Sequence, residues 1–357
     1  MRIAQLVSNY HRVSINTKQA IYSLVAGLSN GLVKKGHQVS LFASGDSGSQ
    51  AELASVTATS TYKMDITETM RRYHLHHLIS ECYRQAENFD VIHSHFNLLS
   101  SFYSDLVKTP SLKSLHSPIS PEIKPLLKKF KHHNYISFSL AQRKQMPELN
   151  WVANIYHGVD THKFKFKLRP KNYLMYLGRI TEDKGVHLAI EAAKAANVQL
   201  IIAGMSYENE GYWHNAIEPN IDGKNIIYAG QLDFDTKVEY LRNARGLLFP
   251  TQYNEVFGMV MIEAMACGTP VIAWKNGSVP EIIKHKQTGY IIKSLPEMVK
   301  AINHLGKINR QAARDRVENL FSMEKMVTGY EKVYQRLMED HLKTNEQKPI
   351  PTNPTNL

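Results

Sequence analysis

Short apolar runs alternate with longer helical patterns along most of this chain, and the alternation occurs twice. Such an order favours parallel sheets, because a parallel strand can follow another only after a crossover. The first series of predicted strands covers residues 3–7, 39–43, 91–93, 111–115, 135–138 and 151–155. The second series covers residues 173–177, 199–203, 226–229, 246–249 and 270–273. We therefore predict an α/β protein with two doubly wound, Rossmann-like domains.

The predicted domains are separated by a linker. Residues 157–171 read HGVDTHKFKFKLRPK, which is basic and loop-like. A chain of 357 residues also exceeds the usual size of one hydrophobic core. We predict an N-terminal domain at 1–157 and a C-terminal domain at 158–322, facing each other across a cleft. A helix at 323–342 is predicted to cross back to the first domain, and residues 343–357 to form a disordered tail.

The composition excludes several classes of protein. Hydrophobic residues make up 43% and charged residues 21%, as in globular proteins, and no apolar run approaches the roughly 20 residues that cross a bilayer. The start, MRIAQLVSNY, becomes polar too early for a signal peptide. Cys82 and Cys267 cannot form a disulfide framework, so we expect a reducing cytoplasm.

The net charge of +11 is spread along the whole chain, so we do not predict a nucleic-acid partner. One basic cluster, KPLLKKFKHH from Lys124 to His133, stands out. It favours either an anionic acceptor or peripheral contact with the inner face of a membrane. The alternative is a solvated helix face.

Ligands of open parallel sheets bind beyond the carboxyl ends of the strands. Gly178 and Arg179 follow the first strand of the second series, and Lys184 lies where the next helix opens. Cations at a helix N-terminus oppose the macrodipole by up to about 1 kcal/mol unless an anion lies among them. This arrangement indicates a phosphate. Neutralisation by Glu182 and Asp183 is the alternative.

Two acids, Glu255 and Glu263, occur around the helix that we predict at 258–267. They belong to the stretch EVFGMVMIEAMACGTPV (255–271). On one continuous helix Glu255 and Glu263 would lie on the order of 12 Å apart, too far to act as one acid–base pair. Glu255 instead falls in the loop before the helix, whose first N–H groups can hold a diphosphate. Glu263 can then bind the hydroxyls of a ribose, while Glu255 faces the group at the other end of the diphosphate. Gly204 and Gly230, at other strand ends, allow a ligand close to the backbone.

The stretch EVFGMVMIEAMACGTPVIAWKNGSVPEII resembles the E-x7-E signature of retaining glycosyltransferases of family 4, which have the GT-B fold. HGVDTHKF, YLGRITEDKG, LIIAG, AGQL and HKQTGYII also occur in the order typical of that family. The resemblance covers nearly all of residues 1–340 and is strongest over 155–293. It implies transfer of a hexose from a UDP-, GDP- or ADP-sugar to a hydroxyl of a glycan, a lipid-linked acceptor or a small molecule. It also implies retention of configuration, with no cofactor and no metal.

The resemblance assigns roles to particular residues. The donor-binding set is Gly178, Arg179, Lys184, Gly204, Gly230, Gln231, Glu255, Phe257, Gly258, Met259, Val260 and Glu263. The catalytic set is His116, Glu255, Arg179 and Lys184, with Arg179 and Lys184 on the diphosphate. DVIHSHF and SLHSP correspond to the two histidine positions of the family, His95 and His116. His116 is the better match for the active-site histidine, with a satisfied core histidine as its alternative, and His95 is the weaker candidate.

The first loop departs from the family pattern, because it reads NYHRVSINTKQA where related chains carry a glycine-rich loop. Ser14, Ile15, Asn16 and Thr17 occupy the place where backbone N–H groups would meet phosphate and acceptor. This departure favours one alternative to glycosyl transfer, a non-catalytic module with a nucleotide pocket. A second alternative stays open independently of the loop. It is another GT-B enzyme, either a sugar-nucleotide epimerase or a phosphorylase.

Two segments have the residue types of a metal site, and we predict that neither binds a metal. RRYHLHHLISEC places His74 and His77 on one helix face without an identifiable third ligand. The DFD sequence at 233–235 precedes a helix, where Asp235 suits an N-cap. Cys267 is expected to be packed at a helix end rather than nucleophilic.

Overall fold

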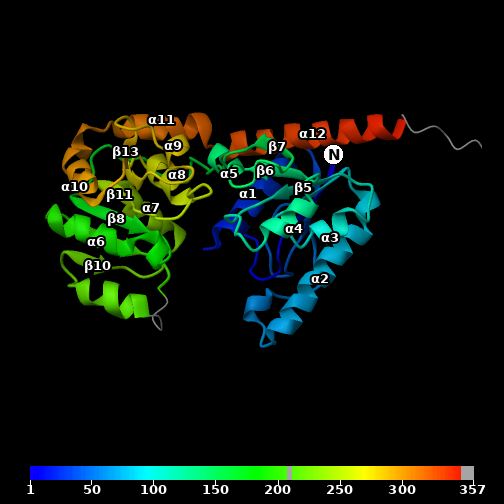
Figure 1. Cartoon of the computed structure of the whole chain (residues 1–357), viewed down its shortest axis with the longest axis horizontal. Coiled ribbons are helices and arrows are strands. Elements are labelled where there is room, and N and C mark those ends of the chain that lie inside the picture. Colours follow the sequence, from blue (N-terminus) through cyan, green and yellow to red (C-terminus); the bar gives the residue numbers. More distant parts are fainter. Residues whose placement is uncertain (207–210, 347–357) are drawn as a thin grey trace, which may run out of the picture.

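The computed structural model describes residues 1–206 and 211–346, which form two α/β lobes (Figure 1). The N-terminal sheet contains β1 (Arg2–Leu6), β2 (Gln38–Phe42), β3 (Glu52–Ala54), β4 (Val91–Ser94), β5 (Ser111–Ser114), β6 (Asn134–Ser137) and β7 (Trp151–Asn154). Its strand order is β3-β2-β1-β4-β5-β6-β7, and every pair is parallel. The order reverses beside β1, as in doubly wound folds.

The C-terminal sheet is also parallel throughout. It contains β8 (Tyr173–Leu177), β9 (Gln199–Ala203), β10 (Ile226–Tyr228), β11 (Gly246–Phe249), β12 (Val271–Trp274) and β13 (Gly289–Ile292), in the order β10-β9-β8-β11-β12-β13. The two sheets confirm the predicted α/β class. Each predicted strand is present within about one residue, whereas β3 and β13 were not predicted as strands.

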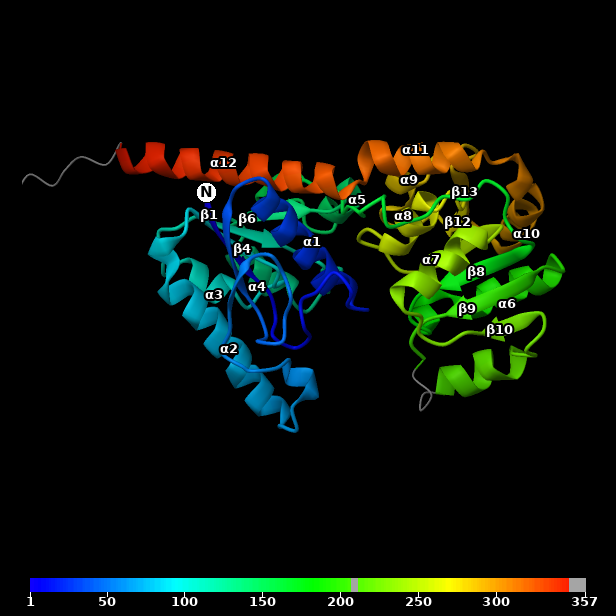
Figure 2. The same ribbon diagram turned by 180° about the vertical axis from the view of Figure 1, so that it is seen from behind.

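Helices cover the faces of both sheets (Figures 1 and 2). Those of the first lobe are α1 (Ala20–Lys34), α2 (Glu68–Arg84), α3 (Ser101–Ser104), α4 (Lys124–Lys129) and α5 (Leu140–Arg143). Those of the second are α6 (Val186–Ala195), α7 (Phe234–Asn243), α8 (Met259–Ala266), α9 (Val279–Ile282), α10 (Leu295–His304) and α11 (Arg310–Leu320). In the part of the chain that the structure describes, we find no helix both long and apolar enough to cross a membrane.

Helix ends follow the local sequence, with one correction. Gly36 and Gly268 end α1 and α8 with φ angles of +86° and +81°, a left-handed conformation that glycine adopts without strain. The prediction that Asp235 caps α7 is wrong. The Asp233 carboxylate instead accepts a hydrogen bond of 2.9 Å from the Thr236 N–H. The helix starts at Phe234, three residues earlier than predicted, which moves the cap position to Asp233.

Helix α12 (Met323–Glu346) runs from the C-terminal lobe across the N-terminal one (Figure 2). Glu331 of this helix accepts hydrogen bonds from Lys35 and His37, both at 2.8 Å. Val327 fills the space beside Gly31 of α1, where an added Cβ would approach within 2.5 Å. Because α12 extends to Glu346, residues 343–346 of the predicted tail are helical. The remainder of that tail, residues 347–357, lies outside the described residues.

The two lobes contact each other beside α5. Glu281 accepts hydrogen bonds of 2.8 Å from the backbone N–H groups of Leu140 and Ala141, and one of 3.1 Å from the Tyr156 hydroxyl. A carboxylate of one lobe thus satisfies the N-terminus of a helix in the other. We propose a domain boundary near residue 157, where β7 has ended and the second sheet has not begun.

Candidate active site

Lys184 and Glu255 form an ion pair at the C-terminal edge of the second sheet. The Lys184 ammonium donates to Glu255 Oε2 at 2.8 Å and to the Tyr253 hydroxyl, which itself donates to Glu255 Oε2 at 2.8 Å. Both charged side chains are mostly buried, with 13% and 12% exposed. The structure thus brings together two residues that the sequence singled out, and it adds Tyr253, which the sequence reasoning missed.

The loop that carries Glu255 leads into the N-terminus of α8. Gly258 has a φ angle of +83°, and a Cβ there would lie 2.6 Å from the Met261 Cε. Ser278 fixes the loop, since its N–H bonds to the Glu255 carbonyl at 3.0 Å and its hydroxyl to the Phe257 carbonyl at 2.7 Å. Within the described residues the N–H groups of Gly258, Met259 and Val260 make no hydrogen bond, so they are free to bind an anion.

Arg179 lies near this ion pair and is exposed. Burial raises the pKa of Tyr253, Glu255 raises it further, and the positive charge of Arg179 lowers it, so the guanidinium is close enough to act on that phenol. The Arg179 side chain makes no hydrogen bond or ion pair among the residues that the structure describes. Its donors therefore stay available beside Lys184.

Glu263 forms a second ion pair, 2.8 Å from the Lys237 ammonium. Lys237 lies on α7 and stands over the rings of Phe164 and Phe234, 5.8 Å and 5.3 Å from their centroids. Sequence reasoning missed Lys237, because nothing local connects it to an acid 26 residues away. A ribose that binds Glu263 would have to share that carboxylate with this lysine.

The glycines at the strand ends differ from one another. A Cβ on Gly204 would lie 1.7 Å from the Gly178 carbonyl oxygen, so a glycine at 204 is needed for the close packing of these neighbouring strand ends. The position that a Cβ on Gly204 would occupy is thus filled by protein, and close approach of a ligand to this residue stays a prediction. Gly230 has a φ angle of +69°, and no atom of the described residues lies within 4 Å of the point that a Cβ on it would occupy. Gln231 after it is exposed, so the backbone near Gly230 remains accessible to a ligand.

His116 lies in the other lobe, just after β5, and is half-buried. Burial lowers the pKa of this imidazole to about 3, so the ring is neutral at neutral pH. It stacks on Phe138 and His157, with centroids 4.8 Å and 5.6 Å away. The His157 ring is in turn 5.0 Å from the ring of Phe257, two residues after Glu255. His157, absent from the predicted site, thus connects the two halves of it.

His95 contacts His116 directly, with its Nδ1 2.9 Å from the Nε2 of His116. It is buried, with 7% of its surface exposed. The structure therefore places the second histidine of the sequence analysis behind the first one.

The loop after β1 is ordered by a second loop. The Val13 N–H donates to the Ser47 hydroxyl at 2.9 Å, and the Val13 carbonyl accepts from the Gly48 N–H at 2.8 Å. A turn follows, closed by a 3.2 Å bond from the Thr17 N–H to the Ser14 carbonyl. The glycines around this loop thus come from the SGDSG segment after β2, and Ile15 and Asn16 are exposed at its tip.

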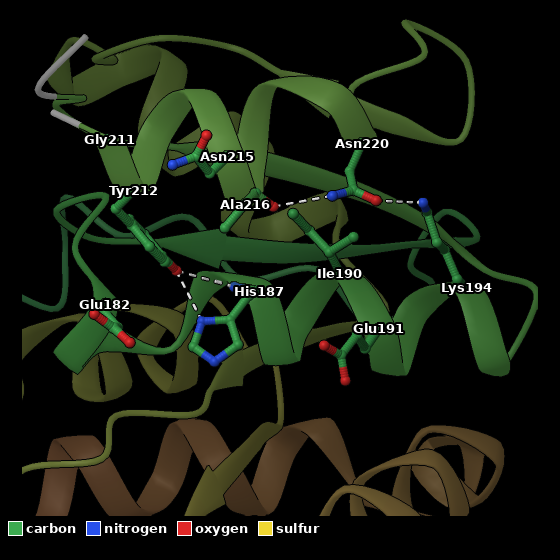
Figure 3. A pocket seen from close by; sticks show the side chains of 10 residues that line it. All are labelled: Glu182, His187, Ile190, Glu191, Lys194, Gly211, Tyr212, Asn215, Ala216 and Asn220. Carbon is green, nitrogen blue, oxygen red and sulfur yellow. Dashed lines mark hydrogen bonds between the residues drawn. The ribbon is translucent and has the colours of Figure 1, made fainter. Parts of the chain in front are cut away.

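A surface pocket in the second lobe lies apart from these residues (Figure 3). His187 and Tyr212 form one side of it, joined by a hydrogen bond of 2.9 Å, and Lys194 donates to Asn220 at 2.6 Å on the other. Apart from Glu182, the residues that line it belong to α6 and the segment after residue 210. None of the predicted donor-binding residues lines this pocket.

The histidine cluster in RRYHLHHLISEC and the basic stretch from Lys124 to His133 contact side chains outside the proposed active site. His76 lies 2.9 Å from the Tyr103 hydroxyl. Asp105 Oδ1 lies 3.2 Å from His132 Nε2 and 2.7 Å from His133 Nε2, and these three atoms are close enough to hold a cation. The sequence analysis did not foresee this group, since Asp105 is distant in the chain.

Cys267 is fully buried, as predicted, and burial raises its pKa to about 12.

Two family models match this chain. The family model described as "Glycosyltransferase Family 4" matches residues 23–163, and the one described as "Glycosyl transferases group 1" matches residues 159–319. The two matches together span both lobes. The chain belongs to glycosyltransferase family 4. It is 28% identical over 280 residues to an uncharacterised glycosyltransferase of Methanocaldococcus jannaschii, in a match that covers 71% of this glycosyltransferase and 78% of the relative.

Solved structures show that this glycosyltransferase has the GT-B fold. Sucrose-phosphate synthase of Thermosynechococcus elongatus matches with a TM-score of 0.75 at 19% identity, over 95% of this chain and 99% of that one. HepE of Anabaena, in complex with UDP and glucose, matches with a TM-score of 0.71 at 16% identity, over 94% of this chain and 100% of that one.

Proposed function

We propose that this glycosyltransferase moves a hexose from a nucleotide diphosphate sugar to an acceptor hydroxyl, with retention of configuration and without a metal. The observation that carries the proposal is the cluster of Lys184, Tyr253 and Glu255 beside the free N–H groups that open α8. Positive charge, unpaired amides and a carboxylate suited to sugar hydroxyls therefore occur together there.

The diphosphate would bind at the N-terminus of α8. The N–H groups of Met259 and Val260 are unpaired among the described residues, and the helix dipole favours an anion. An ammonium has three N–H donors, and Lys184 directs two of them at Glu255 and Tyr253. The third N–H, together with the exposed Arg179 guanidinium, supplies the positive charge that a divalent cation provides in metal-dependent enzymes.

The nucleoside would extend toward Glu263. Its carboxylate can accept hydrogen bonds from two neighbouring ribose hydroxyls once Lys237 gives up part of its contact. The base would then meet the open backbone beside Gly230 and Gln231. The UDP in the structure of Anabaena HepE supports a uridine nucleotide as the first donor to test.

The hexose would lie between Glu255 and His116. Retention follows from a front-face substitution, in which the leaving diphosphate helps to remove the proton from the incoming hydroxyl. Lys184, Arg179 and the α8 amides stabilise the charge that develops on the diphosphate. His116 is neutral and contributes hydrogen bonding rather than charge, so catalysis depends on positioning and electrostatics.

The acceptor would reach the hexose past the loop at Ile15 and Asn16. An anionic or lipid-linked acceptor suits the exposed lysines of α4, namely Lys124, Lys128 and Lys129. His133 is buried against Asp105 and lies outside this basic surface. Cytoplasmic location with peripheral membrane contact stays a prediction.

A donor screen followed by product analysis tests this function. Melting curves with UDP, GDP and ADP should show one nucleotide that stabilises the protein, since ligands of the native state raise its stability by mass action. Incubation of the matching sugar nucleotide with acceptors should give a glycoside with the anomeric configuration of the donor. Conversion of the donor without any acceptor would indicate an epimerase or a phosphorylase. Nucleotide binding without any turnover would indicate a non-catalytic module.

A further inference from the structure

Behind His116, a chain of buried hydrogen bonds runs through the N-terminal sheet to helix α12. His116 Nε2 lies 2.9 Å from His95 Nδ1, and His95 Nε2 lies 2.8 Å from Gln5 Oε1. Gln5 then donates through Nε2 to the Tyr334 hydroxyl at 3.0 Å. Gln5 and Tyr334 are fully buried. Residues from β1, α12 and the end of β4 are thereby joined to one imidazole at the proposed active site.

The same chain continues away from His116. The Tyr334 hydroxyl lies 2.6 Å from His93 Nδ1, and His93 Nε2 lies 2.8 Å from the Ser114 hydroxyl. Ser114 is in turn 3.2 Å from the Tyr330 hydroxyl. All four side chains are buried, so water does not compete for these contacts.

The imidazoles in this series of hydrogen bonds are neutral. Burial, reinforced by the nearby imidazoles, lowers the pKa of His95 well below its ordinary value, and burial lowers that of His116 to about 3. A neutral imidazole has one N–H and one unprotonated nitrogen. Between His95 and His116, therefore, only one ring can be the donor.

The Gln5 carboxamide sets the direction of donation, because it accepts only at Oε1 and donates only at Nε2. Oε1 faces His95 Nε2, so that nitrogen carries the proton and His95 Nδ1 is an acceptor. His116 Nε2 must then donate to His95, which leaves His116 Nδ1 unprotonated. Within the described residues His116 Nδ1 makes no hydrogen bond, and the ring is half-buried.

We propose that Gln5 and His95 are positioning residues that hold His116 in the tautomer with Nε2 protonated. His116 Nδ1 then accepts a hydrogen bond from a hydroxyl of the bound hexose or acceptor. The role of that hydroxyl rests on the proposed function, whereas the tautomer does not. The tautomer of a histidine is set by the partner of its other nitrogen, and here that partner is fixed by a buried amide.

The tautomer can be measured without any substrate. Long-range proton–nitrogen correlation spectra of the full chain labelled with ¹⁵N-histidine distinguish a protonated from an unprotonated ring nitrogen, and a His116→Asn spectrum assigns the signals. We expect one tautomer of His116 at neutral pH, protonated at Nε2. A His116 protonated at Nδ1, or a mixture of tautomers, would overturn the proposal even if the transferase activity is confirmed.

Gln5→Met removes both polar ends of this side chain at nearly the same size. It should turn the His116 signal into a mixture of tautomers and lower kcat by roughly tenfold, about the worth of one neutral hydrogen bond, with donor KM within about twofold. Ser114→Ala is the matched control, since it removes a buried hydroxyl on the far side of Gln5. It should leave the tautomer of His116 unchanged.

His95→Phe provides a second variant in case Gln5→Met does not fold, because it keeps a ring while removing the acceptor of the His116 proton. It should also give mixed tautomers. An unchanged His116 tautomer in either folded variant would contradict the positioning role. If neither the wild type nor any variant transfers a sugar while the spectra behave as expected, the proposed function fails and the tautomer assignment stands.

Discussion

The two halves of the candidate active site compensate the burial of polar groups in different ways. In the C-terminal domain, charges are retained and paired, with Lys184 on Glu255 and Lys237 on Glu263, each at 2.8 Å. In the N-terminal domain, the groups behind His116 are neutral and connected in a chain of hydrogen bonds. The C-terminal half is therefore suited to hold a charged diphosphate, and the N-terminal half to orient hydroxyl groups.

A lysine in each domain makes this contrast concrete. Lys184 has a carboxylate partner, whereas Lys113 of β5 is fully buried and donates to the hydroxyls of Ser100 and Ser104, at 3.2 Å and 2.7 Å. Burial lowers the pKa of Lys113 to about 7. The N-terminal domain thus pushes even a lysine toward its neutral form, which is the same tendency that keeps its histidines uncharged.

The largest effect is expected where a charge is removed from the C-terminal half. Lys184→Ala deletes the ammonium that would contact the diphosphate and leaves Glu255 without its cation, so kcat/KM should fall by at least about 100-fold, or roughly 3 kcal/mol. Lys194→Ala is the matched control, because Lys194 lies on α6 in the pocket of Figure 3 and donates to Asn220 there. Steady-state assays should show wild-type rates for the control. Equal activity of both variants would remove the phosphate role of Lys184.

A smaller effect is expected from the neutral half, and it appears as a pH dependence of stability. The folded-state pKa of Lys113 lies below its unfolded value, so between about pH 7 and 10 the unfolded chain binds more protons. The free energy of unfolding should therefore rise by about 2 kcal/mol from pH 7 to pH 9 through this residue alone.

Lys113→Met removes that titration while keeping most of the length of the side chain. The variant should melt above the wild type at pH 7, and the difference should shrink toward pH 9. Lys128→Met, at an exposed position on α4, controls for the loss of one positive charge. Parallel melting curves of wild type and Lys113→Met across this pH range would show that Lys113 is charged in the folded protein.

Much of the fold could be predicted because it depends on local pattern. The strands are apolar runs bounded by turn residues. Gly36 and Gly268 end helices because glycine adopts the left-handed conformation without strain. β3 (Glu52–Ala54) was missed because it has three residues with no buried one among them. Asp233 was missed as a cap because the predicted start of its helix was three residues too late.

In the candidate site, too, the residues with a local sequence pattern could be proposed, whereas those defined by tertiary contacts could not. Arg179, Lys184, Glu255 and Glu263 could be proposed from the sequence because each is a charged residue after a strand, in the loop before a helix or within a helix, in a pattern that resembles a known family. Their partners could not, since Tyr253 and Lys237 are defined by contacts across the fold. Gln5 and Tyr334 are 329 residues apart, and their pairing depends on where α12 packs. No local pattern marks a buried glutamine as part of an active site.

The central claim is that a diphosphate binds between the N-terminus of α8 and two basic side chains, and a crystal structure with the stabilising nucleoside diphosphate tests it most directly. We predict phosphate oxygens within hydrogen-bond distance of the Met259 and Val260 N–H groups, with Lys184 and Arg179 turned toward them. A diphosphate bound elsewhere, or at α8 with both basic side chains turned away from it, would contradict the account.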